Sequence, residues 1–248
     1  MVYSVGHGDR RMARPAQSRT SYLGVYQSYI LNNMSNQSVN KAILAIILVS
    51  AVALGNARAN ECGSLHNHYG PFDYTSNVHF TKMLPVVEKH HFTPKVEKLL
   101  GGESSSIIGD IDYTLRAFPN HHRALYSLVQ YTFKMEGKKA EYRAAGQHIY
   151  STECYFDRAI RFKPRDGNVR YLFALYLHKK GKHKESLTHY KTALKISPKS
   201  YEIHYNLGLL YMDMKNMAEA KKHAKIAYSG RYPLPGLREK LKKAGFWD

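Results

Sequence analysis

The sequence has few cysteines and few acidic residues, and its apolar runs are short. Residues 42–54 form a run of 13 residues that is apolar apart from Ser50, whereas a membrane-spanning helix needs about 20. This length argues against a stable membrane span. Only 19 acidic residues accompany 37 basic ones, which gives a formal net charge of +18 and a strongly basic chain.

Motifs for catalysis or metal binding are also missing. The sequence has no Gly-rich phosphate loop, no G-x-S-x-G and no H-E-x-x-H. Asp110 and Asp112 are two positions apart, so on a helix they point to different sides. The 14 histidines include no helical i, i+4 pair with a carboxylate, and they are interpreted as surface or packed residues. We expect no enzyme, no cofactor and no metal site.

The apolar run fits a secretory signal peptide. Lys41 precedes it, and Ala57 and Ala59 follow it with the A-x-A spacing of a cleavage site. We expect a signal peptide over residues 34–59, cleavage after Ala59, and a mature protein in the periplasm or outside the cell. Residues 1–33 are interpreted as an upstream extension, with an amphipathic targeting segment as the alternative.

Both cysteines, Cys62 and Cys154, would remain after cleavage. Asn60 and Glu61 precede Cys62, where a lipid-anchored cysteine would need small apolar residues. An exported chain meets oxidising conditions, so a disulfide is expected, closing a loop of 92 positions. Two free buried thiols are the alternative.

Residues 60–104 read as an irregular N-terminal segment, because prolines interrupt it at short intervals. Short helices are predicted within 79–90 and 93–100, the second with Thr93 as N-cap and Pro94 in its first turn. The sequence "GGESSS" at 101–106 is interpreted as a hinge.

A regular period follows. Pro164 and Pro198 are 34 residues apart, and Ala159, Ala193 and Ala227 repeat at the same interval. This regularity is typical of stacked helical repeats, and the segment resembles the tetratricopeptide repeat. The resemblance implies an all-α helical solenoid of about three to four units over residues 105–248. An insertion is expected at about 135–147 and a C-terminal capping helix at about 235–246.

The resemblance also implies a concave face, built from the first helix of each unit, that binds a peptide. Its predicted peptide-binding residues are Arg123, Tyr126, Gln130, Lys134, Tyr171, His178, Lys179, Tyr205, Asn206 and Asp213. Tyrosines 126, 171 and 205 would stack on the ligand, and Arg123, Lys134 and Lys179 would receive its acidic side chains. A tyrosine column that serves only inter-repeat packing is the alternative.

The lysines suggest a second function. Lys191 and Lys222 fall on second helices, which face outward, so they form either a solvated convex face or a binding face for an anionic envelope polymer or membrane surface. Nucleic acid is not expected outside the cytoplasm. The motifs "GPFDY" and "GDIDYTLRAFPNHHRAL" also resemble exported bacterial repeat proteins of unassigned role. We therefore expect a non-catalytic adaptor that binds another exported protein during assembly of an envelope complex.

Overall fold

The computed structural model describes residues 62–136 and 150–247, which lie within the compact unit Ala59–Asp248 and contain helices but no strand. The predicted extension (1–33), signal peptide (34–59) and cleavage point lie outside the described residues, as does most of the predicted insertion (135–147). These assignments stay predictions. The fold class expected from the sequence, an all-α repeat array, is confirmed for the described part of the chain.

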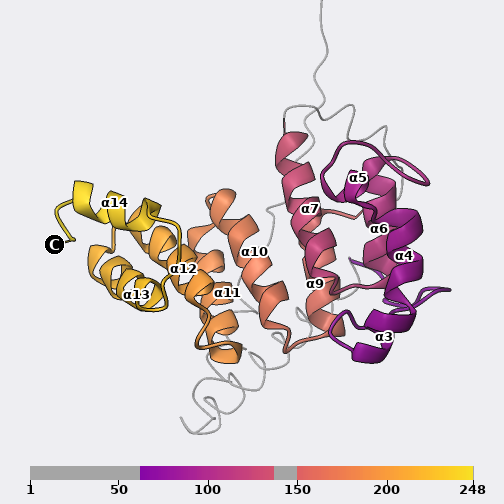
Figure 1. Ribbon diagram of the computed structural model, residues 1–248, viewed down its shortest axis with the longest axis horizontal. Helices are drawn as coiled ribbons and strands as arrows, with labels where there is room; N and C mark the ends of the chain where they lie inside the picture. Colours follow the sequence, from indigo (N-terminus) through magenta and orange to yellow (C-terminus); the bar gives the residue numbers. More distant parts are fainter. Residues whose placement is uncertain (1–61, 137–149, 248) are drawn as a thin grey trace, which may run out of the picture. The chain divides into compact units, whose positions relative to one another are not determined.

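Most of the described helices are joined by connections of a few residues, with longer stretches between α5 and α6 and between α7 and α9 (Figure 1). In chain order they are α3 (Asn77–Lys82), α4 (Leu84–His91), α5 (Pro94–Glu97), α6 (Ile107–Ala117), α7 (His122–Lys134), α9 (Thr152–Phe162), α10 (Gly167–Lys179), α11 (His183–Ile196), α12 (Tyr201–Asp213), α13 (Met217–Ser229) and α14 (Gly236–Lys243). Several begin at a capping side chain: Ser106, Ser151 and Ser200 each accept a hydrogen bond from a backbone N–H in the first turn.

Helices α10 and α11, and likewise α12 and α13, pack as helical hairpins, and the next hairpin stacks on α11 through α12. The period seen in the sequence marks the tightest contacts. Ala159, Ala193 and Ala227 are fully buried in α9, α11 and α13. Ser186, which stands where alanine was expected, is also fully buried, and its hydroxyl donates to the carbonyl of Ala174 at 2.8 Å. Small residues at these positions let paired helices approach closely.

The last hairpin is covered by α14, which lies within the predicted capping range. Leu237 and Leu241 are fully buried, and α14 packs on both α12 and α13. Gly208 of α12 makes this approach possible, because a Cβ atom there would come within 2.5 Å of Leu237 Cδ2. The cap therefore removes from water an apolar face that the final repeat cannot bury alone.

The opposite end is covered by the segment that precedes the repeats. Its short helices α3, α4 and α5 lie within the range expected to be irregular. Phe92 and Val96 are buried in the same core as the repeats, and Leu84 and Val87 pack with Phe118 at the end of α6. Residues 62–106 thus form an N-terminal cap over α6 and α7, and we use this name below.

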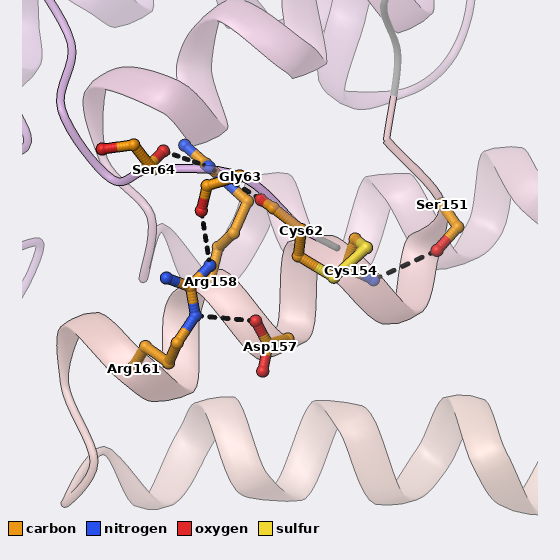
Figure 2. The surroundings of a disulfide bond; sticks show 8 residues. All are labelled: Cys62, Gly63, Ser64, Ser151, Cys154, Asp157, Arg158 and Arg161. Atoms are coloured by element: carbon orange, nitrogen blue, oxygen red, sulfur yellow. Dashed lines mark hydrogen bonds and ion pairs between the residues drawn. A yellow bond between two sulfur atoms is a disulfide. The ribbon is translucent and has the colours of Figure 1, made fainter. Parts of the chain in front are cut away.

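A disulfide joins the N-terminal cap to α9, as predicted, between Cys62 and Cys154 (Figure 2). The guanidinium of Arg158, which is 2% exposed, donates to the carbonyl oxygens of Cys62, at 3.1 Å, and Ser64. Arg161 donates to the carbonyl of Gly63 at 2.9 Å. Burial lowers the pKa of Arg158, and the carbonyls of Cys62 and Ser64 both accept from its Nη1, whereas its Nε has no hydrogen-bond partner in the described part of the chain.

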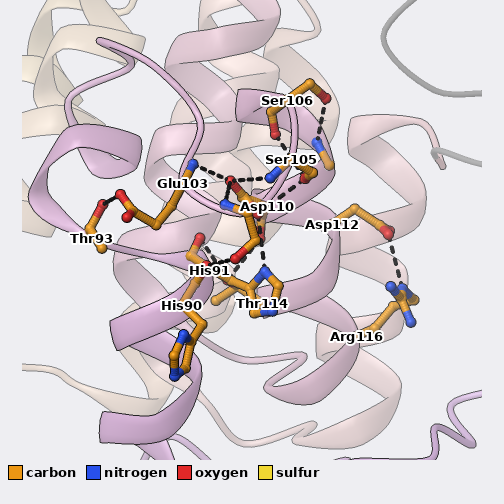
Figure 3. Close-up of polar contacts among 12 residues, drawn as sticks. His90, His91, Thr93, Glu103, Ser105, Ser106, Asp110, Asp112, Thr114 and Arg116 are labelled. Atoms are coloured by element: carbon orange, nitrogen blue, oxygen red, sulfur yellow. Dashed lines mark hydrogen bonds and ion pairs between the residues drawn. The ribbon is translucent and has the colours of Figure 1, made fainter.

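The sequence predicted a hinge at 101–106, and this prediction is wrong. The buried carboxylate of Asp110 accepts backbone N–H groups from Glu103 at 2.6 Å and from Ser104 and Ser105 at 3.2 Å each (Figure 3). His91 of α4 contacts its other oxygen at 3.0 Å. A carboxylate that collects these groups fixes the loop against α6 instead of leaving it free to bend.

Removal of the disulfide should destabilise the protein. In the double variant Cys62→Ser, Cys154→Ser we expect the free energy of unfolding to fall by about 2–4 kcal/mol, because the bridge closes a loop of 92 residues in the unfolded chain. Urea titration followed by circular dichroism measures the change. Wild-type protein under reducing conditions is the matched control and should unfold like the variant. Equal urea midpoints for the oxidised wild type and the variant would contradict a stabilising role.

Asp110 should account for part of the acid sensitivity. Burial alone would raise its pKa, but hydrogen bonds from Glu103, His91 and Ser105 hold it below its ordinary value. Its contribution is therefore present above about pH 4, where the unfolded carboxyl is ionised, and is lost as pH falls through the folded pKa. We expect Asp110→Asn to lower stability at pH 7 by about 2–4 kcal/mol and to flatten the decline between pH 7 and 3.

Urea midpoints measured across this pH range test the expectation. The exposed carboxylate Glu185 on α11 provides the control, since Glu185→Gln should leave the pH profile unchanged. If the Asp110→Asn profile runs parallel to that of the wild type, the carboxylate does not act through its ionisation.

Candidate functional site

A cavity of about 910 Å³ lies along the first helices of successive hairpins, α7, α10 and α12. We call it the concave groove. Its lining residues are Glu97, His122, Arg123, Tyr126, Val129, Gln130, Asn168, Tyr171, Leu172, Leu175, His178, Lys179, Glu202, Asn206, Asp213, Tyr232 and Leu234. Glu97 belongs to the N-terminal cap, and Tyr232 and Leu234 precede α14. The end elements therefore contribute walls to the groove together with the repeats.

The groove contains eight of the ten side chains predicted for peptide binding: Arg123, Tyr126, Gln130, Tyr171, His178, Lys179, Asn206 and Asp213. Lys134 and Tyr205 are not in its lining. The ammonium group of Lys134 donates to the carbonyl of Leu99 at 3.0 Å. Tyr205 is buried, and its ring packs 4.6 Å from the ring of Tyr232, which lines the groove in its place.

The three tyrosines expected to stack on a ligand differ in exposure. Tyr126 is 49% exposed, whereas Tyr171 and Tyr205 are 7% and 6% exposed. The hydroxyl of Tyr171 accepts from Asn206 Nδ2 at 2.9 Å, and that of Tyr126 accepts from Gln130 Nε2 at 3.0 Å. Tyr126 alone of the three offers a ring face to the groove, and Tyr171 and Tyr205 serve mainly packing between helices.

The predicted acid-binding residues are also not free to act as first expected. Arg123 donates to Glu97 at 2.8 Å and to Glu88 at 3.0 Å. The hydrogen bond from Arg123 lowers the pKa of Glu97, and the two carboxylates raise the pKa of Arg123. Arg123 is thus neutralised by the N-terminal cap, and it ties α7 to that cap.

The remaining charged side chains of the groove differ in whether they have a partner. His178 contacts Asp213 at 2.8 Å, between α10 and α12. The ammonium group of Lys179 lies 4.1 Å from the centre of the Phe133 ring, a cation–π distance. Glu202 has no ion pair with any side chain in residues 62–136 and 150–247.

The net charge of the groove is opposite to that of the chain. Arg123 and Lys179 are its cations, and Glu97, Glu202 and Asp213 are its anions. With neutral histidines the lining therefore carries a formal charge of about −1, whereas the whole chain carries +18. An acidic ligand gains little from such a lining.

The outward lysines occupy the second helices, as the repeat pattern predicted. Lys191, Lys195 and Lys222 line a second hollow of about 640 Å³ together with Glu219 and His223. Lys222 pairs with Glu219 at 3.5 Å. This surface therefore carries part of the basic charge expected on the convex side.

The histidines near the groove have structural partners. His121 caps α7, since its Nδ1 accepts from the N–H of Ala124 at 3.1 Å while Nε2 contacts Glu88 at 3.0 Å. Burial lowers the pKa of His121, which favours the neutral form that this cap requires. His122 contacts Asp166, the N-cap of α10, at 2.9 Å. Within the described ranges, no group of three His, Cys, Asp or Glu side chains could hold a metal ion.

None of the described helices combines the length and the apolar character needed to cross a membrane.

The family model for the TPR repeat matches residues 174–215, which run from α10 to the end of α12. Residues 174–215 are therefore tetratricopeptide-repeat sequence. The match falls on the hairpins where the period of 34 residues and the buried small residues are most regular.

Short stretches of two larger proteins are similar in sequence. Protein O-mannosyl-transferase TMTC1 of Mus musculus is 39% identical over 71 residues, which are 29% of this chain and 7% of that protein. The Homo sapiens protein of the same name is 38% identical over 71 residues, covering 29% and 8%. The chain therefore spans less than a tenth of the length of the curated relatives it matches.

Solved structures with similar helices include the MamA protein, with a TM-score of 0.37 and 20% identity over 55% of this chain and 65% of that one. Another is YrrB, described as a TPR protein with an unusual peptide-binding site. Its TM-score is 0.34, with 18% identity over 70% of this chain and 100% of that one.

Proposed function

We propose that this protein is a non-catalytic adaptor whose concave groove holds a peptide segment of a partner protein. The observation that carries the proposal is the groove itself, built by the first helices of successive repeats with apolar side chains left in water. Tyr126 is 49% exposed and Leu234 is 51% exposed, and both line it. Burial of such side chains by a ligand is favourable at about 25 cal/mol per Å² of apolar surface.

The chemistry of the lining supports binding in preference to catalysis. Serine, threonine and cysteine, the side chains most often used as nucleophiles, do not occur among the groove residues. Arg123 is held by two carboxylates, and His178 is held by Asp213. Such paired groups serve to connect helices and to fix the shape of the groove.

The disulfide supports export as the setting for this function. A bridge such as Cys62–Cys154 persists in oxidising compartments and is rare in the cytosol. Together with the signal peptide predicted over residues 34–59, it favours the periplasm or the cell exterior. The partner would then be another exported or envelope protein, bound during assembly of an envelope complex.

Binding of an anionic envelope polymer is a second candidate, favoured by the hollow on the second helices. Lys191, Lys195 and Lys222 line it with Glu219 as its carboxylate. Three cations against one anion would attract a polyanion or an anionic membrane surface, with an affinity that falls steeply as salt rises.

A random peptide display library selected on the purified protein tests the groove. We expect enriched peptides, and we expect Tyr126→Ala to weaken their binding by about 1–3 kcal/mol because it removes an exposed aromatic contact. Fluorescence anisotropy of labelled peptides measures this loss. Lys191→Ala on α11 is the matched control and should bind as the wild type does, and thermal melts should show that both variants fold.

Two outcomes would count against the adaptor. Peptides that bind Tyr126→Ala and the wild type equally would place the site elsewhere. Binding to vesicles containing phosphatidylglycerol that disappears in 0.5 M salt and in a Lys191→Ala, Lys222→Ala variant would favour the polymer-binding function.

A further inference from the structure

Glu202 differs from the other charged side chains of the concave groove. Arg123 is bound to Glu88 and Glu97, Asp213 is bound to His178, and Lys179 lies on the Phe133 ring. Glu202, in the first turn of α12, is exposed and has no cation within ion-pair distance in the described part of the chain. The hydroxyl of Tyr171 lies within hydrogen-bonding reach of Glu202, but no cation offsets its charge, which therefore remains for a ligand. Lys179 likewise has no carboxylate partner in the described part of the chain, but its ammonium group lies against the Phe133 ring.

Aromatic and amide groups lie near Glu202 at the α12 end of the groove. Asn206 Nδ2 donates to the Tyr171 hydroxyl at 2.9 Å and to the backbone carbonyl of Glu202 at 3.0 Å. Tyr232 and Leu234 line the same groove, and Tyr232 is backed by Tyr205. Hydrogen bonds thus hold the side chain of Asn206 in place, and Tyr232 and Leu234 add apolar surface to the same lining.

Electrostatics agree with this placement. Burial and the nearby Glu202 carboxylate both raise the pKa of Tyr171, and the same two causes raise the pKa of Tyr232. These hydroxyls therefore remain neutral at physiological pH and place dipoles beside a negative charge, and the half-buried ring of Tyr232 belongs to the same lining. A carboxylate beside aromatic rings is suited to an ammonium or guanidinium group, which gains both charge pairing and cation–π contact.

The groove as a whole favours the same ligand. Its lining is formally negative although the chain is basic. Its apolar side chains Val129, Leu172 and Leu175 belong to α7 and α10. Arg123 and Lys134, which were predicted to receive acidic side chains, are occupied by the N-terminal cap. A ligand with a basic residue would pair with Glu202, and its apolar residues would cover the apolar side chains of the rest of the groove.

We propose that Glu202, with Tyr171 and Tyr232 beside it, forms a subsite for a lysine or arginine side chain of the bound peptide. This inference rests on the proposed peptide-binding function and names the partner segment as basic and apolar. It reverses the polarity expected from the sequence, in which the groove was to receive acidic residues.

Selection of the same random peptide library on the wild type and three variants tests the subsite. Peptides enriched on the wild type should carry Lys or Arg at one recurrent position. Selection on Glu202→Gln should retain apolar preferences and lose the basic one, and selection on Glu202→Lys should enrich Asp or Glu at that position. Glu185→Lys, which reverses an exposed charge on α11, is the matched control and should leave the basic preference intact.

Affinities of synthetic peptides make the test quantitative. A wild-type-selected peptide and its Lys→Gln counterpart, both with blocked termini, should differ by about 3- to 10-fold in Kd on the wild type and little on Glu202→Gln. If the Lys→Gln peptide with a free amino terminus binds as tightly as the blocked lysine peptide, the recognised cation is the peptide terminus, and the assignment to a side chain is wrong.

The outcomes separate the subsite from the function on which it rests. If no peptide is enriched on the wild type, the adaptor function fails. Peptides that are enriched and depend on Tyr126 support the adaptor function. If these peptides show no preference for a basic residue, or show the same preference when selected on Glu202→Lys, the proposed subsite is wrong. Melting temperatures of the Glu202 variants close to that of the wild type establish that the fold is retained.

Discussion

Each helical hairpin in this protein leaves one apolar face that another element must cover, and the rest of the structure follows from this constraint. Inside the array the next hairpin supplies the cover, with Ala193 of α11 fully buried and α11 packed on α12. At the two ends no repeat is available. Helix α14 covers one end through Leu237 and Leu241, and the N-terminal cap covers the other through Phe92 and Val96. The ends decide whether the array is stable in water.

The disulfide and several long-range polar contacts connect the N-terminal cap to the repeats. The helices of the N-terminal cap are short, and short helices gain little stability from their own hydrogen bonds. The disulfide Cys62–Cys154, the buried Arg158 and the buried Asp110 each connect this cap or its loop to the helices beneath. The same cap contributes Glu97 to the groove and binds Arg123, so the cover of the core also determines the charge of the site.

The sequence predicted the features that follow from the 34-residue period. It did not predict contacts between the repeats and the segments outside them. The spacing of 34 residues placed the small buried residues correctly and brought most of the predicted groove residues onto the first helices. Position within a repeat does not reveal whether a neighbouring element covers a side chain. Tyr205 was expected on the surface of the groove, but it is covered by Tyr232 from the segment before α14.

Long-range polar contacts were the least predictable part. The spacing of Asp110 and Asp112 correctly implied different sides of a helix, and Asp112 does bind Arg116 and Tyr155 instead of the loop. Nothing in "GGESSS" indicated that its N–H groups would surround a carboxylate five to seven residues later. Glycine and serine predict flexibility only while their backbone groups remain bound to water.

The separation of charge between groove and surface affects how a partner would approach. The chain as a whole is positive, so its long-range field opposes a basic segment, while Glu202 attracts it at short range. Salt screens exposed charges over about 8–10 Å and acts less on partly buried pairs. Because Glu202 is exposed, moderate salt screens both the long-range repulsion and the pair at Glu202. A basic surface around a weakly acidic groove thus favours selectivity over fast capture, because a basic segment remains bound only when its apolar residues also fit between the helices.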